Sequence, residues 1–154
     1  MATGDEFAPA VVRRATVEDA LDLAAMIAEF NGPQGDADET AARLATCDGL
    51  ETALIAWAAA EAVGFACVRV TPAIGTRVPH ALLVELYVRA PYRRRGIARA
   101  LVQQAEALAL EQGAIHLVLY TGRQNLTAQA FYERLGFESL DITYEKPLVA
   151  KAPD

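Results

Sequence analysis

The sequence is poor in the residues that build disulfide frameworks and metal centres. Its 154 residues include two cysteines, Cys47 and Cys67, and two histidines. The cysteines are far apart, stand among apolar neighbours and match no metal-binding or redox spacing. We therefore expect two buried free thiols in a reducing compartment, with no metal site.

Long hydrophobic runs are also missing. No stretch approaches the length of about 20 apolar residues at which a helix crosses a bilayer. The first residues, Met1–Glu6, carry acid rather than the basic start of a secretory signal. We therefore expect a cytoplasmic location and no membrane partner.

Basic residues are outnumbered, with 14 Lys and Arg against 20 Asp and Glu and a formal net charge of -6. A body of this charge repels polyanions, so we expect no nucleic-acid partner. The length suits one domain with a substantial core. We predict a single domain over residues 10–149, flanked by flexible tails at 1–9 and 150–154.

The hydrophobic periodicity predicts a mixed succession of strands and helices. Strands are expected at 11–14, 52–59, 62–71, 81–88 and 115–120, with one or two more between 137 and 148. Helices are expected from 20 to about 31, at 38–45, at 96–112 and at 125–135. Hairpins in the first half and a β-α-β crossover in the second predict an α/β fold with a mixed sheet and helices on both faces.

The most informative stretch runs from Val88 to Ala98, where a strand leads into Arg93-Arg94-Arg95, a glycine and a helix. A helix start leaves its first N–H groups unpaired and carries partial positive charge, so it binds anions. Gly96 lacks the side chain that would hold a phosphate away from those groups, and Ala98 is small. The pattern predicts a seat for a pyrophosphate.

The alternatives for this stretch are a solvated loop and a site for another phosphate ligand. The sequence lacks Gly-Lys-Ser/Thr and Gly-x-Gly-x-x-Gly, which argues against a nucleotide.

Two motifs resemble those of the GNAT family of acetyl-CoA-dependent N-acetyltransferases. Arg93-x-x-Gly96-x-Ala98 is similar to the family's pyrophosphate signature, and Asn125-x-x-Ala128-x-x-Phe131-Tyr132-x-x-x-Gly136-Phe137 resembles its fourth-helix motif. Tyr144–Leu148 resembles the last strand of many members. The resemblance covers residues 84–148, whereas 11–71 agree only in the order of elements. It implies a GNAT-type mixed, mostly antiparallel sheet flanked by helices, with a β-α-β unit that binds coenzyme A.

The resemblance also implies where acetyl-CoA is held. The strands holding 85–88 and 117–120 are expected to splay apart, with pantetheine in the gap. A backbone N–H near Tyr87 or Val88 is expected to face the thioester oxygen. Asn125 is expected to cap its helix, to bind a pantetheine amide, or to do both. The remaining cofactor-binding candidates are Arg93, Arg94, Arg95, Gly96, Ile97 and Ala98.

Two residues are candidates for proton transfer. Tyr132 is the candidate general acid for the departing thiolate, and its alternative role is a core tyrosine. Glu85 is the only charged residue in an apolar strand, so it is a candidate base or acceptor-binding residue. Its alternative is to point outward, or to pair with Arg69 or Arg89. His80 and His116 are weaker candidates.

The binding site for the acceptor amine is expected at the loop over residues 30–36. In the family this region commonly forms one wall of the acceptor cleft. Acidic residues crowd this region, namely Glu29, Asp36, Asp38 and Glu39. They suit a cationic amine, or they are helix caps and solvated charges. The sequence thus predicts an N-acetyltransferase that acts by direct transfer to a primary amine of a small molecule or peptide, with a homodimer as a possible assembly. The alternative is a non-catalytic acyl-CoA-binding module.

The anion seat yields a first prediction. Replacing Gly96 with a bulky residue will weaken coenzyme A binding more than Arg94→Ala does. The reason is that backbone N–H groups form the anion seat, whereas the arginine side chains lie at its edge. Calorimetric titration of the two variants with coenzyme A measures the difference. An Arg94→Ala variant that binds more weakly than the Gly96 variant would contradict this view.

Overall fold

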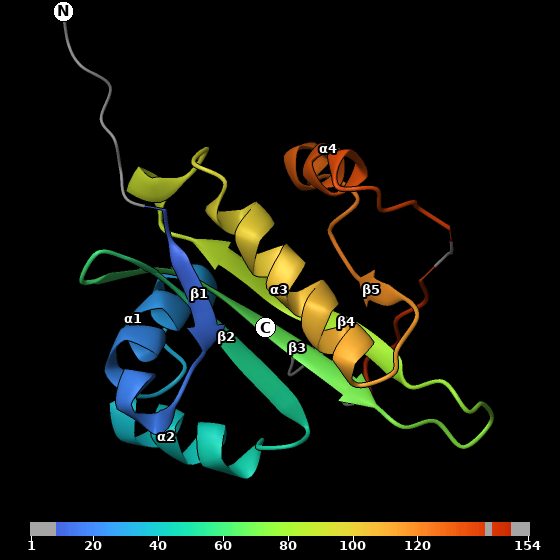
Figure 1. Cartoon of the computed structure of the whole chain (residues 1–154), viewed down its shortest axis with the longest axis horizontal. Helices are drawn as coiled ribbons and strands as arrows, with labels where there is room; N and C mark the ends of the chain where they lie inside the picture. The colour runs from blue at the N-terminus through green and yellow to red at the C-terminus, as the bar shows by residue number, and fades with distance from the viewer. Residues whose placement is uncertain (1–8, 141–142, 149–154) are drawn as a thin grey trace, which may run out of the picture. The chain divides into compact units, whose positions relative to one another are not determined.

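The computed structural model describes residues 9–140 and 143–148 (Figure 1). These residues fall into two compact units, one reaching to Tyr120 and the other starting at Thr121. The tails expected at 1–9 and 150–154 lie outside the described residues, apart from Pro9. The single domain over 10–149 stays a prediction.

The first unit is built on a five-stranded sheet in the order β1-β2-β3-β4-β5. The strands are β1 (Val11–Arg14), β2 (Glu51–Ala58), β3 (Glu61–Thr71), β4 (His80–Val88) and β5 (Leu117–Leu119). The pairings from β1 to β4 are antiparallel, and β4 pairs with β5 in parallel. This confirms the mixed, mostly antiparallel sheet.

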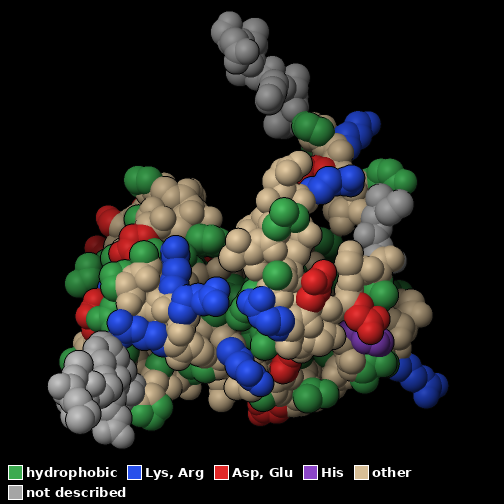
Figure 2. Space-filling model, turned by 90° about the horizontal axis from the view of Figure 1, so that it is seen from above, with side chains coloured by type: hydrophobic (Ala, Val, Ile, Leu, Met, Phe, Trp, Pro, Cys, Tyr) green, Lys and Arg blue, Asp and Glu red, His purple; other side chains and the backbone are tan. Residues whose placement is uncertain are grey.

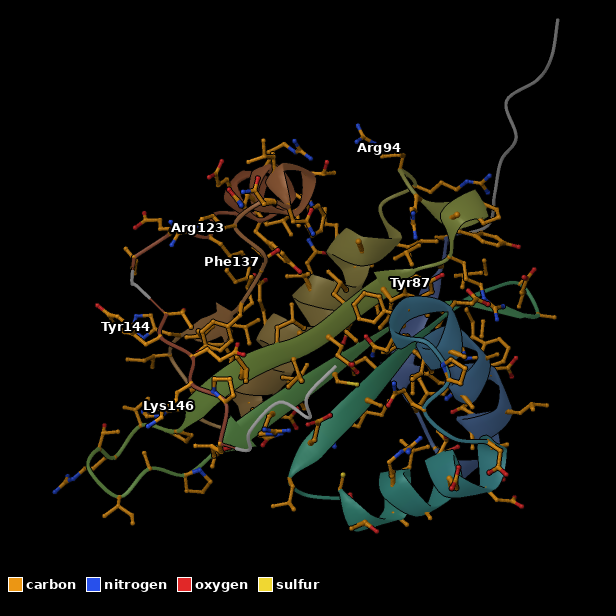
Figure 3. The ribbon with its side chains drawn as sticks, turned by 180° about the vertical axis from the view of Figure 1, so that it is seen from behind. Tyr87, Arg94, Arg123, Phe137, Tyr144 and Lys146 are labelled. Atoms are coloured by element: carbon orange, nitrogen blue, oxygen red, sulfur yellow. The ribbon has the colours of Figure 1, made fainter. Side chains whose placement is uncertain are left out.

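Helices cover both faces of this sheet. A short 3-10 turn, η1 (Val17–Asp19), leads into α1 (Ala20–Asn31), and α2 (Ala37–Thr46) follows it. Between β4 and β5 lie the turn η2 (Ala90–Tyr92) and helix α3 (Ile97–Glu111). Figures 1 and 3, which view opposite sides, show α3 over one face and α1 with α2 over the other.

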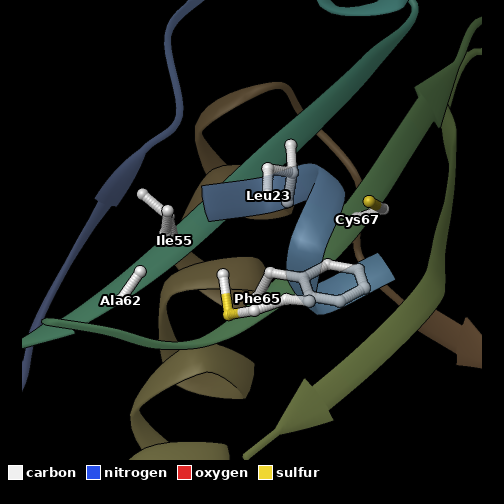
Figure 4. Close-up of a cluster of buried hydrophobic side chains, with 6 residues drawn as sticks. Leu23, Ile55, Ala62, Phe65 and Cys67 are labelled. Atoms are coloured by element: carbon white, nitrogen blue, oxygen red, sulfur yellow. The ribbon is translucent and has the colours of Figure 1, made fainter. Parts of the chain in front are cut away.

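The core on the α1 side is a cluster of six buried residues, Leu23, Met26, Ile55, Ala62, Phe65 and Cys67 (Figure 4). The α3 side buries Leu101, Val102 and Ala105. Cys67 is buried as expected, whereas Cys47 is only partly buried because it caps the C-terminal end of α2. Both thiols are free.

The second unit contains α4 (Leu126–Arg134), which corresponds to the fourth predicted helix. The strands expected between 137 and 148 are absent from the described residues 137–140 and 143–148. A strand needs a neighbour to pair its N–H and C=O groups, and Pro147 has no N–H to offer. Tyr144 and Leu148 are almost fully exposed, so this segment buries little apolar surface.

Within the described ranges, no helix is long and apolar enough to cross a membrane. The same residues bring together no group of three or more His, Cys, Asp or Glu side chains that would hold a metal ion.

The start of α1 depends on a buried carboxylate. Asp19 accepts hydrogen bonds of 2.7 Å from both terminal nitrogens of Arg13 and from the backbone N–H of Thr16. Its side chain is 6% exposed. The paired Arg13 guanidinium and the Thr16 N–H hold the pKa of the Asp19 carboxyl below its usual value. One side chain therefore joins β1 to the first helical turn.

We predict that Asp19→Asn lowers the free energy of unfolding by about 2 kcal/mol at pH 7, because it removes a charge-assisted, two-pronged contact. The folded-state pKa lies below that of the unfolded chain, so this stabilisation is complete above about pH 4 and is lost as the pH falls through the lower folded-state value. Urea unfolding at several pH values measures it.

Asp38→Asn, on an exposed carboxylate of α2, serves as the matched control and should change stability by less than about 0.5 kcal/mol. Equal stability of Asp19→Asn and wild type at neutral pH would refute the role of Asp19.

Candidate active site

The end of β4 has a free edge. β5 pairs with β4 only over Ala81–Leu83, so Val84–Val88 continues without a β5 partner. On the other edge the β3 register shifts by one residue between Cys67 and Val68, which leaves Val84 as an unpaired bulge residue. The two strands thus part beyond Leu83, as predicted from the sequence.

The direction of the backbone at this free edge follows from the β3 ladder. The N–H of Arg89 donates to the carbonyl of Val63 across 2.9 Å. Because successive N–H groups of a strand point to opposite sides, the N–H of Val88 faces the free edge and that of Tyr87 faces β3. The carbonyl of Val88 accepts from Nε of Arg93 at 2.8 Å, which agrees with this direction.

The free edge leads into the uncapped start of α3. Gly96 is the N-cap residue and has a φ of +79°, and no side chain caps the helix there. A Cβ added to Gly96 would meet no described atom within 4 Å, so packing does not require the glycine. The left-handed backbone and the open space in front of the first N–H groups account for it.

The three arginines differ in their surroundings. The Arg93 side chain donates to the Val88 carbonyl, and its Cζ lies 5.8 Å from the centroid of the Tyr87 ring. These two contacts fix the loop to β4. Arg95 lies 5.4 Å from the centroid of the Tyr92 ring. Arg94 has a φ of +64° and projects away from the sheet (Figure 3). Figure 2 shows several basic side chains on the face of the molecule where α3 begins.

Polar side chains of β4 join the free edge to the last turn of α1. Glu85 accepts a 2.6 Å hydrogen bond from Nδ2 of Asn31. The Tyr87 hydroxyl donates to Glu29 across 2.8 Å, and Nε of Arg89 donates to Glu29 across 3.1 Å. Alternate residues of β4 thus face the same helix end, because side chains of a strand repeat every second residue.

Glu85 is half-buried and has no arginine partner among the described residues. The pairings considered from the sequence are therefore wrong. Arg69 binds Glu51 at 2.6 Å, since the two residues are opposite one another on β3 and β2. Arg89 forms an ion pair with Glu29 instead.

Three aromatic rings line the α1 side next to Glu85. The ring centroids of Phe30, Phe65 and Tyr87 lie 5.4 to 6.1 Å apart. Burial raises the pKa of Tyr87, and its hydrogen bond to Glu29 raises it further. Tyr87 is therefore a neutral hydroxyl donor at physiological pH.

Cys67 lies opposite Glu85 in the β3–β4 register. Burial raises the pKa of its thiol well above the usual value, and the negative charge of Glu85 adds to this effect. A thiol kept protonated in this way is a poor nucleophile. The arrangement therefore gives no support to a covalent mechanism at Cys67.

The second unit holds Asn125 and Tyr132. Oδ1 of Asn125 accepts from the backbone N–H of Ala128 at 3.1 Å, so Asn125 caps α4. The Tyr132 ring stacks edge-on against Phe131 and Phe137. Burial raises the pKa of Tyr132, which keeps its hydroxyl protonated.

The sequence did not identify Glu29 and Asn31 as contact partners of the site. Both belong to the end of α1 that was expected near the acceptor, but no local pattern indicates contacts across more than 50 positions. The side chains of His80 and His116 are exposed, and neither forms a side-chain hydrogen bond or an ion pair among the described residues.

Comparison with known proteins supports one family. Residues 18–137 match the profile of the Acetyltransferase (GNAT) family. Human N-acetyltransferase 8 is 41% identical over 56 residues, which make up 36% of this chain and 25% of that protein. Aminoglycoside N(6')-acetyltransferase type 1 of Acinetobacter genomosp. 13 is 39% identical over 69 residues, or 44% of this chain and 47% of that protein. The matches thus span a quarter to about half of these relatives' lengths.

Solved structures show the same fold. The ribosomal-protein-alanine N-acetyltransferase from Brucella melitensis biovar Abortus 2308 superposes with a TM-score of 0.79 at 23% identity, covering 92% of this chain and all of that one. AAC(6')-Iy in complex with a CoA-S-monomethyl-acetylneamine bisubstrate analogue gives 0.77 at 21% identity, with coverages of 91% and 99%. At these identities the likeness establishes the fold.

The Arg89 contacts generate a stability prediction. The Arg89 side chain is 19% exposed, binds Glu29 and donates to the Ala62 carbonyl at 2.9 Å. Arg89→Met keeps the length but removes the donor to the Ala62 carbonyl and the positive partner of Glu29, which keeps its hydrogen bond from Tyr87. We therefore expect a loss of about 1–2 kcal/mol in the free energy of unfolding.

Arg69→Met is the matched control, because the Arg69–Glu51 pair is also an arginine–glutamate contact but the Arg69 side chain is 50% exposed. We expect that variant to lose less than about 0.5 kcal/mol. Denaturant unfolding compares the two, and equal losses would contradict a special role for Arg89.

Proposed function

This chain belongs to the Acetyltransferase (GNAT) family, and on that premise we propose that it transfers an acetyl group from acetyl-CoA directly to a primary amine. The observation that carries the proposal is the free edge of β4 at Val84–Val88, which leads into the uncapped start of α3. The edge offers backbone hydrogen bonds to an extended ligand, and the helix start offers N–H groups to an anion.

The residues at this edge fit coenzyme A. The N–H groups of residues 94–98 are the proposed seat of the pyrophosphate, with Gly96 and Ala98 keeping its front open. Arg93 holds the turn against β4. Asn125 is the proposed partner of a pantetheine amide. Acetyl-CoA supplies, when bound, an acetyl group activated as a thioester.

Two groups of β4 are proposed to act on the reacting atoms. Val88 directs its N–H to the free edge, so it is the proposed donor to the thioester oxygen, a contribution of about 3 kcal/mol. Tyr87 is a less suitable donor because its N–H faces β3. Glu85 is the proposed acceptor of the proton that the amine loses before it forms the new bond.

Tyr132 is the proposed donor of a proton to the departing sulfur. A general acid must be protonated when it acts, and the raised pKa of Tyr132 meets that requirement. The family motif around α4 supports this assignment.

The proposed acceptor is a small-molecule or peptide amine that carries positive charge in solution. A half-buried carboxylate without a cationic partner favours an ammonium group. Two similar structures are aminoglycoside acetyltransferases, one of them in complex with sisomicin. A cytoplasmic location and a homodimer remain part of the proposal, and size-exclusion chromatography with light scattering tests the dimer.

The proposed chemistry predicts the behaviour of two variants. With acetyl-CoA and a panel of primary amines, wild type should release free coenzyme A thiol. Tyr132→Phe and Glu85→Gln should each lower kcat by about 100-fold and leave coenzyme A affinity unchanged, because each removes one proton transfer. Thiol release and calorimetry measure the two quantities.

Tyr144→Phe is the control for Tyr132→Phe, since Tyr144 is 90% exposed, and it should behave as wild type. Absence of coenzyme A binding would refute the proposed function. Binding without thiol release for any amine would instead support a non-catalytic acyl-CoA-binding module.

A further inference from the structure

Asn31 and Glu85 form a contact that no role in the proposed reaction yet explains. Asn31 is the last residue of α1, and its Nδ2 donates to Oε1 of Glu85 across 2.6 Å. The two residues are 54 positions apart. This contact ties the end of the helix to the stretch of β4 that has no β5 partner.

The groups around Glu85 supply no positive charge to it. From β3 it faces the Cys67 thiol, which stays protonated. The charged side chain at the end of α1 is Glu29, whose carboxylate already accepts a hydrogen bond from Tyr87 and forms an ion pair with Arg89. The three residues of β5 carry no titratable side chain, and α3 lies over the other face of the sheet. Within the described chain, Glu85 thus meets two neutral hydrogen-bonding groups, the Asn31 amide and the Cys67 thiol.

The Asn31 amide is itself held in place. Gly32 follows it with a φ of +76° and ends the helix. Nε2 of Gln34 donates to the Asn31 carbonyl at 3.3 Å, and Arg43 of α2 donates to the Gln34 carbonyl at 2.7 Å. The turn is therefore fastened to α2 while its asparagine side chain reaches β4.

We propose that Asn31 is a positioning residue that holds one oxygen of Glu85 and thereby aims the other at the acceptor amine. The inference rests on the proposed function. Asn31 occupies Oε1, so Oε2 is the oxygen that takes the proton. The N–H bond of the acceptor ammonium breaks, its electron pair stays on nitrogen, and the proton forms an O–H bond with Oε2. Glu85 returns that proton to water after each turnover, and Asn31 stays neutral throughout.

A hydrogen bond to one carboxylate oxygen fixes the direction of the other oxygen. Removing Asn31 should therefore misplace Oε2 and slow proton transfer from the acceptor. Asn31→Asp keeps the shape but replaces the donor by an acceptor and a like charge. A purely structural Asn31 would tolerate Asn31→Asp about as well as Asn31→Ala.

The contact is tested first in the free protein, without substrate. The side-chain amide protons of Asn31 are followed by ¹⁵N-edited NMR from pH 8 to pH 3 in wild type and in Glu85→Gln. One amide proton should shift as the carboxylate is protonated, and this pH dependence should vanish in Glu85→Gln. An amide signal that is indifferent to pH in wild type would overturn the proposal.

The second test separates kcat from KM at pH 7 with acetyl-CoA and 2-phenylethylamine, whose ammonium group is protonated at that pH. In Asn31→Ala kcat should fall about 10-fold, because a Glu85 side chain without this contact no longer holds Oε2 toward the amine. Asn31→Asp should be affected more strongly. The KM for acetyl-CoA should not change in either variant.

Gln104→Ala, an amide removed from the exposed side of α3, is the matched control and should keep the wild-type kcat. An active wild type whose kcat is unchanged in Asn31→Ala would overturn the role of Asn31 and leave the acetyltransferase proposal intact. A wild type that releases no thiol with any amine would refute the proposed function, while the NMR titration still decides whether the amide senses Glu85.

Discussion

The separation of β5 from β4 beyond Leu83 is the constraint on which the rest of the site depends. Paired backbone groups inside a sheet are unavailable to ligands, whereas Val84–Val88 keeps one edge free while β3 satisfies the other. The free edge therefore combines rigid support with open hydrogen-bonding groups. The chain continues from this edge into η2 and the glycine that begins α3, so the backbone of one continuous segment presents both strand-edge and helix-start donors. Such a combination suits a long ligand with an anionic group and an extended arm.

The last turn of α1 adds side-chain chemistry to this backbone arrangement. Glu29 and Asn31 bind alternate residues of β4 and leave the opposite face of the sheet to the packing of α3. The negative charge of Glu29 is balanced by Arg89, whereas Glu85 meets two neutral groups, the Asn31 amide and the Cys67 thiol. Of two neighbouring carboxylates, one is thus paired with an arginine, and the other is the one we propose to bind the acceptor ammonium. Charge balance, rather than residue type, separates their roles.

The sequence predicted the order and type of elements up to α4 because each carries its own local signals. Hydrophobic periodicity, the glycine at Gly96 and the Asn125 cap are such signals, and all agree with the structure. The strands expected after residue 137 were wrong in the described part, since apolar residues such as Tyr144 and Leu148 indicate a strand only if they find a surface to cover. The arginine partners considered as an alternative for Glu85 were also wrong. Arginines were considered because their charge is opposite to that of Glu85. In the structure, the strand register places Arg69 beside Glu51, and the end of α1 places Glu29 beside Arg89, so each arginine forms an ion pair with another carboxylate.

The sequence by itself determined the fold class, the family resemblance and the helix start at Gly96 where the anion seat is proposed. All three depend on short stretches whose conformation follows from neighbouring residues. Only the tertiary structure decided which groups of β4 face the free edge and which side chain meets Glu85. Those facts depend on where the ladder between β4 and β5 stops and on a contact between residues 54 positions apart. Pairing length and helix placement result from packing of the whole unit, so no local pattern in the sequence encodes them.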